Sequence, residues 1–173
     1  MIMPAGRPLL LPANPRFIAF TIVLALLLSV MLSRSGQAWL PDLLAVTLVF
    51  WNVHQPRRVG MVLAMLMGLL MDVHESALLG QNALSYLLLS YMALSVNRRL
   101  VGFGALQQAL QVLPMFVLAA AVEWLSRLIA LDGWPQWPQL LAPLLQAALW
   151  PVASVLLLAP QRRAHDPDDI RPL

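Results

Sequence analysis

Apolar residues dominate this chain in six runs, and most of the charged residues lie in the short connectors between the runs or in the two ends of the chain. The runs cover residues 17–33, 40–53, 59–73, 77–96, 106–130 and 140–159. A helix that crosses a bilayer needs about 20 mainly apolar residues, within a range of about 17–25. The pattern therefore predicts an all-α, polytopic integral membrane protein with six transmembrane helices, of which the second and third are short.

Two of these runs allow another interpretation. The second and third could form a re-entrant hairpin beside four full spans, because irregular chain at membrane depth is tolerated where protein buries it. The first run follows Arg7 and Arg16, as the core of a secretory signal would. It is longer than the usual signal core of about 7–15 residues, and more spans follow it. We expect a retained first helix in a single domain over residues 1–160, with a disordered cytoplasmic tail over 161–173.

The composition agrees with a membrane protein. Of 173 residues, 60% are hydrophobic and only 11% are charged, whereas a soluble domain has about 25% charged residues. The basic pI of about 10.6 does not indicate nucleic-acid binding, because the arginines stand singly or in pairs and form no stripe. The absence of cysteine excludes a disulfide, a thiol nucleophile and a thiolate metal site.

The arginines alternate between connectors. All 11 cations are arginines. Nine of them, which we assign to one side, are Arg7, Arg16, Arg57, Arg58, Arg98, Arg99, Arg162, Arg163 and Arg171; only Arg34 and Arg127 break this pattern. By the positive-inside rule this predicts a bacterial inner-membrane protein with an even number of crossings and both termini in the cytoplasm, where arginines also meet anionic headgroups of the lipid bilayer.

Two acidic residues stand at predicted helix ends. Asp42 follows Pro41 at the start of the second helix, where a carboxylate accepts hydrogen bonds from free backbone N–H groups. Asp72 closes the third helix, where the helix dipole disfavours an anion. We expect backbone N–H groups in the following turn, around residues 76–81, and Asn82 to stabilise Asp72 and so to shape the outer surface.

Glu123 and Arg127 are one helical turn apart in the fifth run and share a face. They could stabilise each other near the interface, or they could form a site for a polar substrate or a partner's headgroup contact. Ala64 and Gly68, one helical turn apart, predict close packing of the third helix. The amides Gln107, Gln108 and Gln111 in the fifth run and Gln146 in the sixth predict hydrogen bonds between helices.

Enzymatic sites are not apparent. The histidines at 54, 74 and 165 lack the spacing of metal ligands, so we expect neither a metal site nor a cofactor. No nucleophile–base set, glycine-rich phosphate loop or carboxylate pair can be assembled. The sequence therefore predicts a protein that is not an enzyme.

Residues 41–108 resemble the MreD family of rod shape-determining membrane proteins. Residues 41–44 read PDLL at the start of one helix, 54–57 read HQPR, 68–72 read GLLMD, 79–84 read LGQNAL, and Tyr91 follows. Members of that family often carry a glycine four residues after the acid, where this chain has Ser76. A serine there would be strained if the turn needs a positive φ.

The resemblance implies six helices arranged as in the substrate-binding subunits of energy-coupling-factor transporters. It also implies a scaffold of the cell-elongation machinery, acting with MreC, the MreB filament, and the RodA glycosyltransferase with its class B transpeptidase. The residues that we expect to be structural or to bind a partner are Asp42, Asp72, Gly80, Asn82, Glu123 and Arg127.

A small-molecule-binding subunit of a transporter is the alternative function, because a fold alone does not determine a function. Such a protein needs several polar and aromatic groups that converge near the outer face. The short outer connectors offer few of them, mainly Asp72, His74, Glu75, Gln81, Asn82, Asp132 and the tryptophans. This scarcity favours the scaffold.

Overall fold

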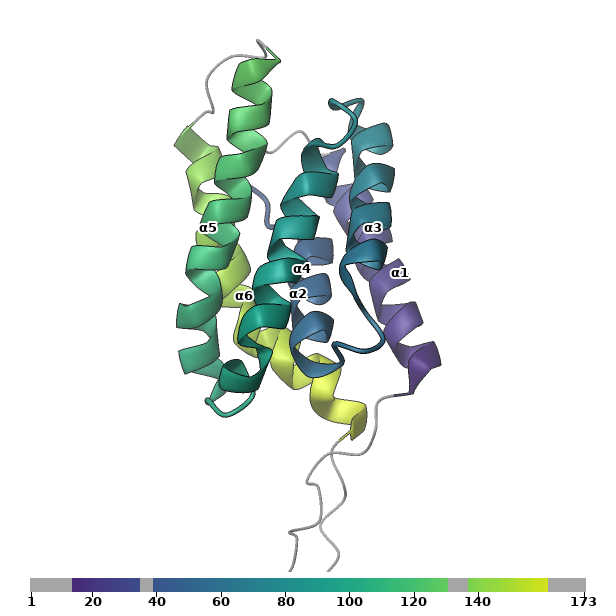
Figure 1. Ribbon diagram of the computed structural model, residues 1–173, viewed down its shortest axis with the longest axis vertical. Coiled ribbons are helices and arrows are strands. Elements are labelled where there is room, and N and C mark those ends of the chain that lie inside the picture. The colour runs from purple at the N-terminus through teal and green to yellow at the C-terminus, as the bar shows by residue number, and fades with distance from the viewer. Residues whose placement is uncertain (1–13, 35–38, 131–136, 162–173) are drawn as a thin grey trace, which may run out of the picture.

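The protein is a bundle of six α-helices (Figure 1). The computed structural model describes residues 14–34, 39–130 and 137–161, and these parts contain helices and connectors but no strand. The helices are α1 (Pro15–Ser33), α2 (Leu43–His54), α3 (Met61–Glu75), α4 (Gln81–Leu100), α5 (Ala105–Ile129) and α6 (Ala142–Leu158), with short 3₁₀ helices η1 (Trp137–Leu141) before α6 and η2 (Ala159–Gln161) after it. Successive helices run in opposite directions (Figure 1). The predicted all-α fold with six helices is confirmed.

The helix boundaries differ most from the apolar runs at the start of α2 and at both ends of α4. α2 begins at Leu43 and not at 40, because Asp42 is its N-cap. α4 begins at Gln81 and not at 77, and it continues to Leu100. Arg98 and Arg99 therefore lie in the last turn of α4 and not in a loop; cations are favourable there because the helix dipole is negative at that end.

The assignment of Gln161 to the predicted tail is wrong, since Gln161 is buried in η2 and its Nε2 donates to the Leu157 carbonyl over 3.2 Å. Residues 162–173 lie outside the described residues, so the predicted tail is not tested there.

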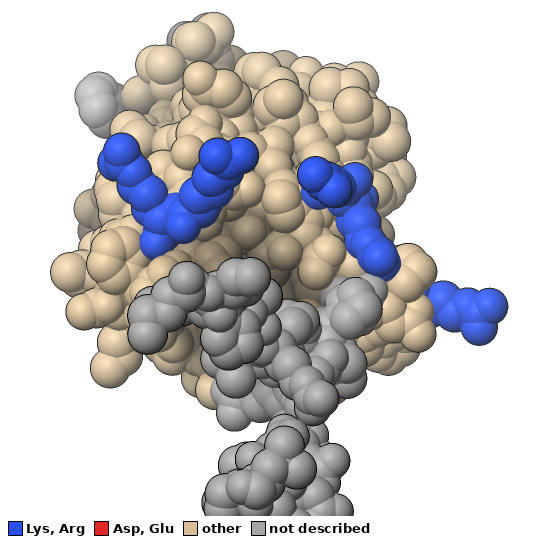
Figure 2. All heavy atoms as spheres, turned by 60° about the horizontal axis from the view of Figure 1, so that its bottom comes forward, with Lys and Arg blue, Asp and Glu red and all other residues tan. Residues whose placement is uncertain are grey.

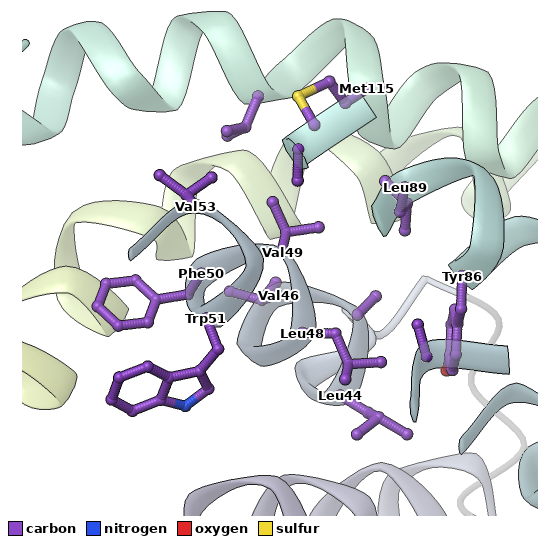
Figure 3. Close-up of a cluster of buried hydrophobic side chains, with 14 of the residues drawn as sticks. Leu44, Val46, Leu48, Val49, Phe50, Trp51, Val53, Tyr86, Leu89 and Met115 are labelled. Atoms are coloured by element: carbon purple, nitrogen blue, oxygen red, sulfur yellow. The ribbon is translucent and has the colours of Figure 1, made fainter. Parts of the chain in front are cut away.

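α2 lies at the centre of the bundle. Every residue from Leu44 to Val53 is buried, and Figure 3 shows their side chains extending in several directions around the helix. A helix that is apolar all round must be covered on every side, and α1, α4 and α6 pack against it. With 12 residues and about 1.5 Å of rise per residue, α2 is about 18 Å long, too short for the roughly 30 Å hydrocarbon core. α2 alone therefore does not span the hydrocarbon core.

The outer surface of the bundle is apolar. Leu106, Leu110, Val62 and Leu156 are 64–78% exposed, a surface that suits contact with lipid tails. In the described part of the chain, three helical segments are long and apolar enough to cross a membrane: Pro15–Ser33, Ala105–Ile129 and the combined segment Trp137–Gln161. α2 and α3 are shorter than these segments, and α4, although it has 20 residues, is less apolar.

Helices α3 and α4 approach each other very closely. A Cβ atom added to Gly68 would lie 2.4 Å from the Ala83 Cα and 2.6 Å from its backbone nitrogen. Ala64, one turn earlier, is fully buried. The predicted pair of small residues, Ala64 and Gly68, thus packs α3 against another helix of the same chain, α4.

Polar side chains join the helices at several buried points. Gln108 on α5 donates from Nε2 to the Leu100 carbonyl at the end of α4 and accepts from Trp150 Nε1 on α6. The expected hydrogen bonding between helices is thus made by Gln108, whereas Gln107 and Gln111 are exposed. An amide buried in an apolar bundle is stable only with such partners.

The charges separate between the two ends of the bundle. Arg16, Arg57, Arg58, Arg98 and Arg99 lie where α1, α3 and α5 begin and α2 and α4 end, and we call this the arginine end. Figure 2 shows arginine side chains around this end and no acidic side chain among the described residues in view. The described acidic residues Asp42, Asp72, Glu75 and Glu123 lie toward the opposite end.

Candidate functional site: a polar cavity opposite the arginine end

A cavity of about 780 Å³ opens opposite the arginine end, and all six helices contribute to its wall. Near the helix ends the wall is polar, with residues such as Glu75, Asn82, Glu123, Arg127 and Gln139. One or two turns deeper it is mainly apolar, with Ala45, Met71, Leu89 and Phe116. The expectation of few convergent polar groups is therefore wrong, because most of them project from within the helices and not from the connectors.

Asp42 joins three helices beside this cavity. Its Oδ1 accepts from the Leu44 backbone N–H over 2.9 Å, which confirms the predicted N-cap, and from the Ser29 hydroxyl on α1 over 2.8 Å. Its Oδ2 accepts a short hydrogen bond from the Tyr86 hydroxyl on α4. Ser29 Oγ in turn accepts from the same Leu44 N–H over 2.9 Å. Asp42 thus ties the start of α2 to α1 and α4.

Asp72 caps a helix to which it does not belong. α3 continues to Glu75, so Asp72 lies in the last turn of α3. Its Oδ1 accepts from the backbone N–H of Asn82 over 2.7 Å, and its Oδ2 accepts from those of Gly80 over 2.8 Å and Ala83 over 3.4 Å. These donors are the unpaired N–H groups at the start of α4, where the helix dipole is positive. The anion that α3 disfavours is therefore stabilised by α4.

The turn between these helices needs two residues with positive φ. Ser76 ends α3 at φ 52°, and Gly80 precedes α4 at φ 104°. The expected strain at Ser76 is present, because a residue with a Cβ atom is unfavourable in the left-handed region. Gly80 suits its position for the same reason, and its backbone N–H donates to Asp72.

A second acid links this turn to α1. Glu75 accepts from the Ser33 hydroxyl over 3.0 Å and from Asn82 Nδ2 over 3.1 Å. Asn82 thus contacts both acids of α3, one through its backbone and one through its side chain. Together with the close approach at Gly68, these bonds lock the α3–α4 hairpin.

Glu123 and Arg127 both line the cavity from α5. Arg127 is close enough to act electrostatically on the Glu123 carboxylate, which also lies beside the Ser85 hydroxyl. Within residues 14–34, 39–130 and 137–161 no ion pair joins these two side chains. Whether they stabilise each other, as the sequence suggests, stays a prediction.

The candidate residues thus divide into two groups. Asp42, Asn82, Glu123 and Arg127 line the cavity. Asp72 and Gly80 do not line it, and they shape the adjacent turn. Asp132 lies outside the described residues.

Sequence reasoning missed the contributions of Tyr86, Ser29 and Gln139. A signal existed for the first two. Tyr86 stands one helical turn after Asn82, and Ser29 stands one turn before Ser33, so each pair marks a polar face on an otherwise apolar helix. No comparable spacing marks Gln139, whose buried Oε1 has no hydrogen-bond partner. In the part of the chain that the structure describes, no group of His, Cys, Asp or Glu could hold a metal ion.

Comparison with known proteins identifies one family. The family model described as rod shape-determining protein MreD matches residues 13–159. No curated protein and no solved structure matches the chain. The predicted likeness to substrate-binding subunits of energy-coupling-factor transporters therefore stays a prediction.

Proposed function

The chain belongs to the MreD family of rod shape-determining membrane proteins, and from this we propose that it is a non-enzymatic scaffold of the bacterial cell-elongation complex in the inner membrane. In this role it binds the membrane anchor of MreC, and through MreC it supports the MreB filament and peptidoglycan synthesis by RodA and its class B transpeptidase. The observation that carries the proposal is the family match, which extends over residues 13–159.

The α3–α4 hairpin is the structural feature that supports a scaffold role. The residues that carry the family resemblance in α3 and α4 are bound to one another: Gly68 permits the close approach, Asp72 caps α4, and Gly80 and Asn82 donate to Asp72. Such a locked hairpin gives the protein a fixed shape at one end. A fixed shape suits a partner that docks by close packing.

The exposed apolar helix faces suit the MreC anchor. Helices associate in lipid through close van der Waals fit and interhelical hydrogen bonds, because lipid tails are as apolar as the side chains. The outward side of α3 carries Val62, Leu66, Leu70 and Val73, which are 48–71% exposed. These residues repeat every three or four positions and so form one continuous stripe.

Deletion of the gene tests the function. In a rod-shaped host the loss should give rounded, wider cells, and expression of the full chain should restore the width. The transporter alternative predicts instead an unchanged shape and a new nutrient requirement, and that outcome would overturn the scaffold.

Co-purification tests the partner. Tagged protein that is solubilised in mild detergent should retain full-length MreC. The control is MreC whose anchor has been replaced by an unrelated apolar helix of equal length. Equal recovery of both forms would show that the anchor is not what this protein binds.

A further inference from the structure

We propose that the polar cavity binds an amphiphile with a zwitterionic headgroup, in which a primary ammonium and a phosphate lie close together. The site would take this chemistry from a membrane lipid or from a soluble molecule with the same headgroup. The inference goes beyond the scaffold role, because it gives the same protein a ligand.

The first observation is that charges of both signs line the cavity without being joined to each other. Glu123, Arg127 and Arg34 all belong to its wall. The two arginines provide guanidinium groups that suit a phosphate, and Glu123 provides a carboxylate that suits an ammonium. A ligand with only one charge would leave the opposite wall charge without a partner.

The second observation separates Glu123 from the other acids. Asp42 already accepts from Ser29, Leu44 and Tyr86, and Glu75 already accepts from Ser33 and Asn82. Glu123 lies beside Ser85, whose hydroxyl donates to the Ala119 carbonyl over 2.7 Å. Glu123 is therefore the carboxylate of the wall with the most capacity for a new donor.

The third observation is an acceptor without a donor. Oε1 of Gln139 is buried and has no hydrogen-bond partner, although Gln139 lines the cavity. Buried polar atoms are nearly always paired, so such an atom requires an explanation. A primary ammonium has three N–H donors, which is enough for a carboxylate and for an amide oxygen once the Gln139 side chain turns toward the cavity.

The fourth observation is the order of polarity with depth. The charged residues lie near the helix ends, whereas Met71, Leu89 and Phe116 lie deeper in the wall. An amphiphile would place its headgroup among the charges and its apolar part below them. The volume of about 780 Å³ lies within the range of about 300–1,000 Å³ of pockets that bind organic ligands.

The free-energy cost of placing charged side chains in a membrane also favours a ligand in this cavity. Ionisable groups at membrane depth are expensive, and they usually face a cavity and mark a functional site. A ligand that pairs with Glu123 and with the arginines at once would offset that cost for both signs.

Native mass spectrometry of the full chain in detergent tests the proposal. The bound fraction is measured against the concentration of dioleoyl phosphatidylethanolamine, and of dioleoyl phosphatidylglycerol, which has the same tails and phosphate but no ammonium. We expect phosphatidylethanolamine to bind at least roughly tenfold more tightly, because only it satisfies Glu123. Equal binding of the two lipids would overturn the zwitterionic assignment.

Two charge variants give distinct patterns. Glu123→Gln should weaken binding of phosphatidylethanolamine by roughly ten- to a hundredfold and leave phosphatidylglycerol unchanged, whereas Arg127→Gln should weaken both. Arg98→Gln, at the arginine end, is the matched control and should change neither. If Glu123→Gln weakens both lipids equally, the ammonium does not bind at Glu123.

A variant that fills the cavity without removing a charge tests the site independently of the charge variants, which could misfold. Ala120 lines the cavity, so Ala120→Leu should fill it and abolish binding of both lipids. Ala148→Leu makes the same change at an exposed position of α6 and should bind as the wild type does. Unchanged binding by Ala120→Leu would show that the lipids bind elsewhere.

Competition identifies the source of the headgroup. Free phosphoethanolamine that displaces the lipid at equal concentration would indicate a soluble ligand. Displacement only by the intact lipid would indicate the membrane, because the tails then contribute. Either result supports the zwitterionic site, and the lipid comparison decides whether the site exists.

Discussion

At the residue scale, Asp72 and Asp42 both cap the start of a helix. They differ in whether another acceptor remains for the backbone N–H groups when the carboxylate is removed. The three N–H groups that Asp72 accepts belong to the first turn of α4, and a helix start has no other intrahelical acceptors for them. Asp42 accepts from one backbone N–H, that of Leu44, which also reaches Ser29 Oγ. Its other donors are the hydroxyls of Ser29 and Tyr86, which line the open cavity, where water can replace the carboxylate. The loss of Asp72 therefore leaves more donors unsatisfied.

Asp72→Ala should accordingly lower the free energy of unfolding by about 2–5 kcal/mol, since a lost cap costs about 0.5–2 kcal/mol and a donor that stays buried without a partner adds about 1–3 kcal/mol. Asp72→Asn should be intermediate because it keeps one acceptor. Asp42→Ala is the matched comparison and should cost less. Thermal unfolding in detergent measures the order, and cell width in a complemented deletion strain measures the consequence. Full complementation by Asp72→Ala at normal membrane levels would contradict the structural role.

Ser76 holds a conformation that a glycine would adopt without strain. At φ 52° a side chain costs about 1–2 kcal/mol, and the extra flexibility of an unfolded glycine recovers about 0.5–1 kcal/mol of that difference. Ser76→Gly should therefore raise the free energy of unfolding by up to about 1 kcal/mol. Gly80→Ala, the converse change at φ 104°, should lower it. A lower melting temperature for Ser76→Gly would contradict this account of the turn.

At the element scale, the α3–α4 hairpin combines a close approach with a cap one turn later. Gly68 and Asp72 are four residues apart, so they lie on the same face of α3. Gly68 brings the backbones together, and Asp72 then reaches the start of α4. We expect the close approach at Gly68 and the hydrogen bonds of Asp72 to depend on each other.

Gly68→Ala should separate the two helices, because its Cβ atom would lie 2.4 Å from the Ala83 Cα, which is backbone and cannot rotate away. Overpacking of this kind costs about 1–3 kcal/mol. Gly102→Ala is the control, since the nearest atom there is at an ordinary 3.5 Å. In a double-mutant cycle with Asp72→Ala the two losses should not add, because the separation already weakens the cap. Additive losses would show that the two residues act independently.

At the scale of the whole molecule, the separation of charge predicts the orientation. The arginine end should face the cytoplasm and the cavity should face outward. A reporter that is active only in the periplasm should therefore be active when fused after Ala130, at the end of α5, and silent when fused after Gly102, between α4 and α5. Immunoblots of both fusions control for expression. Activity at Gly102 would reverse the orientation and place the cavity on the cytoplasmic side.

The sequence by itself determined the class of the protein and the number of its helices. Apolar runs and alternating arginines suffice for this, because bilayer thickness and surface charge act on each segment separately. The sequence also predicted the N-cap at Asp42 and the need for backbone donors at Asp72, since both follow from the chain within about ten residues.

Only the tertiary structure decided which helix is central, which donors reach Asp72 and that a cavity exists. α2 is buried because its neighbours surround it, and no pattern within its own 12 residues distinguishes that from burial in lipid. The cavity depends on Ser29, Tyr86, Glu123 and Gln139, which come from α1, α4, α5 and η1. Their meeting depends on how far apart the helices pack, and that distance is fixed by contacts such as Gly68 against Ala83, between residues far apart in the chain.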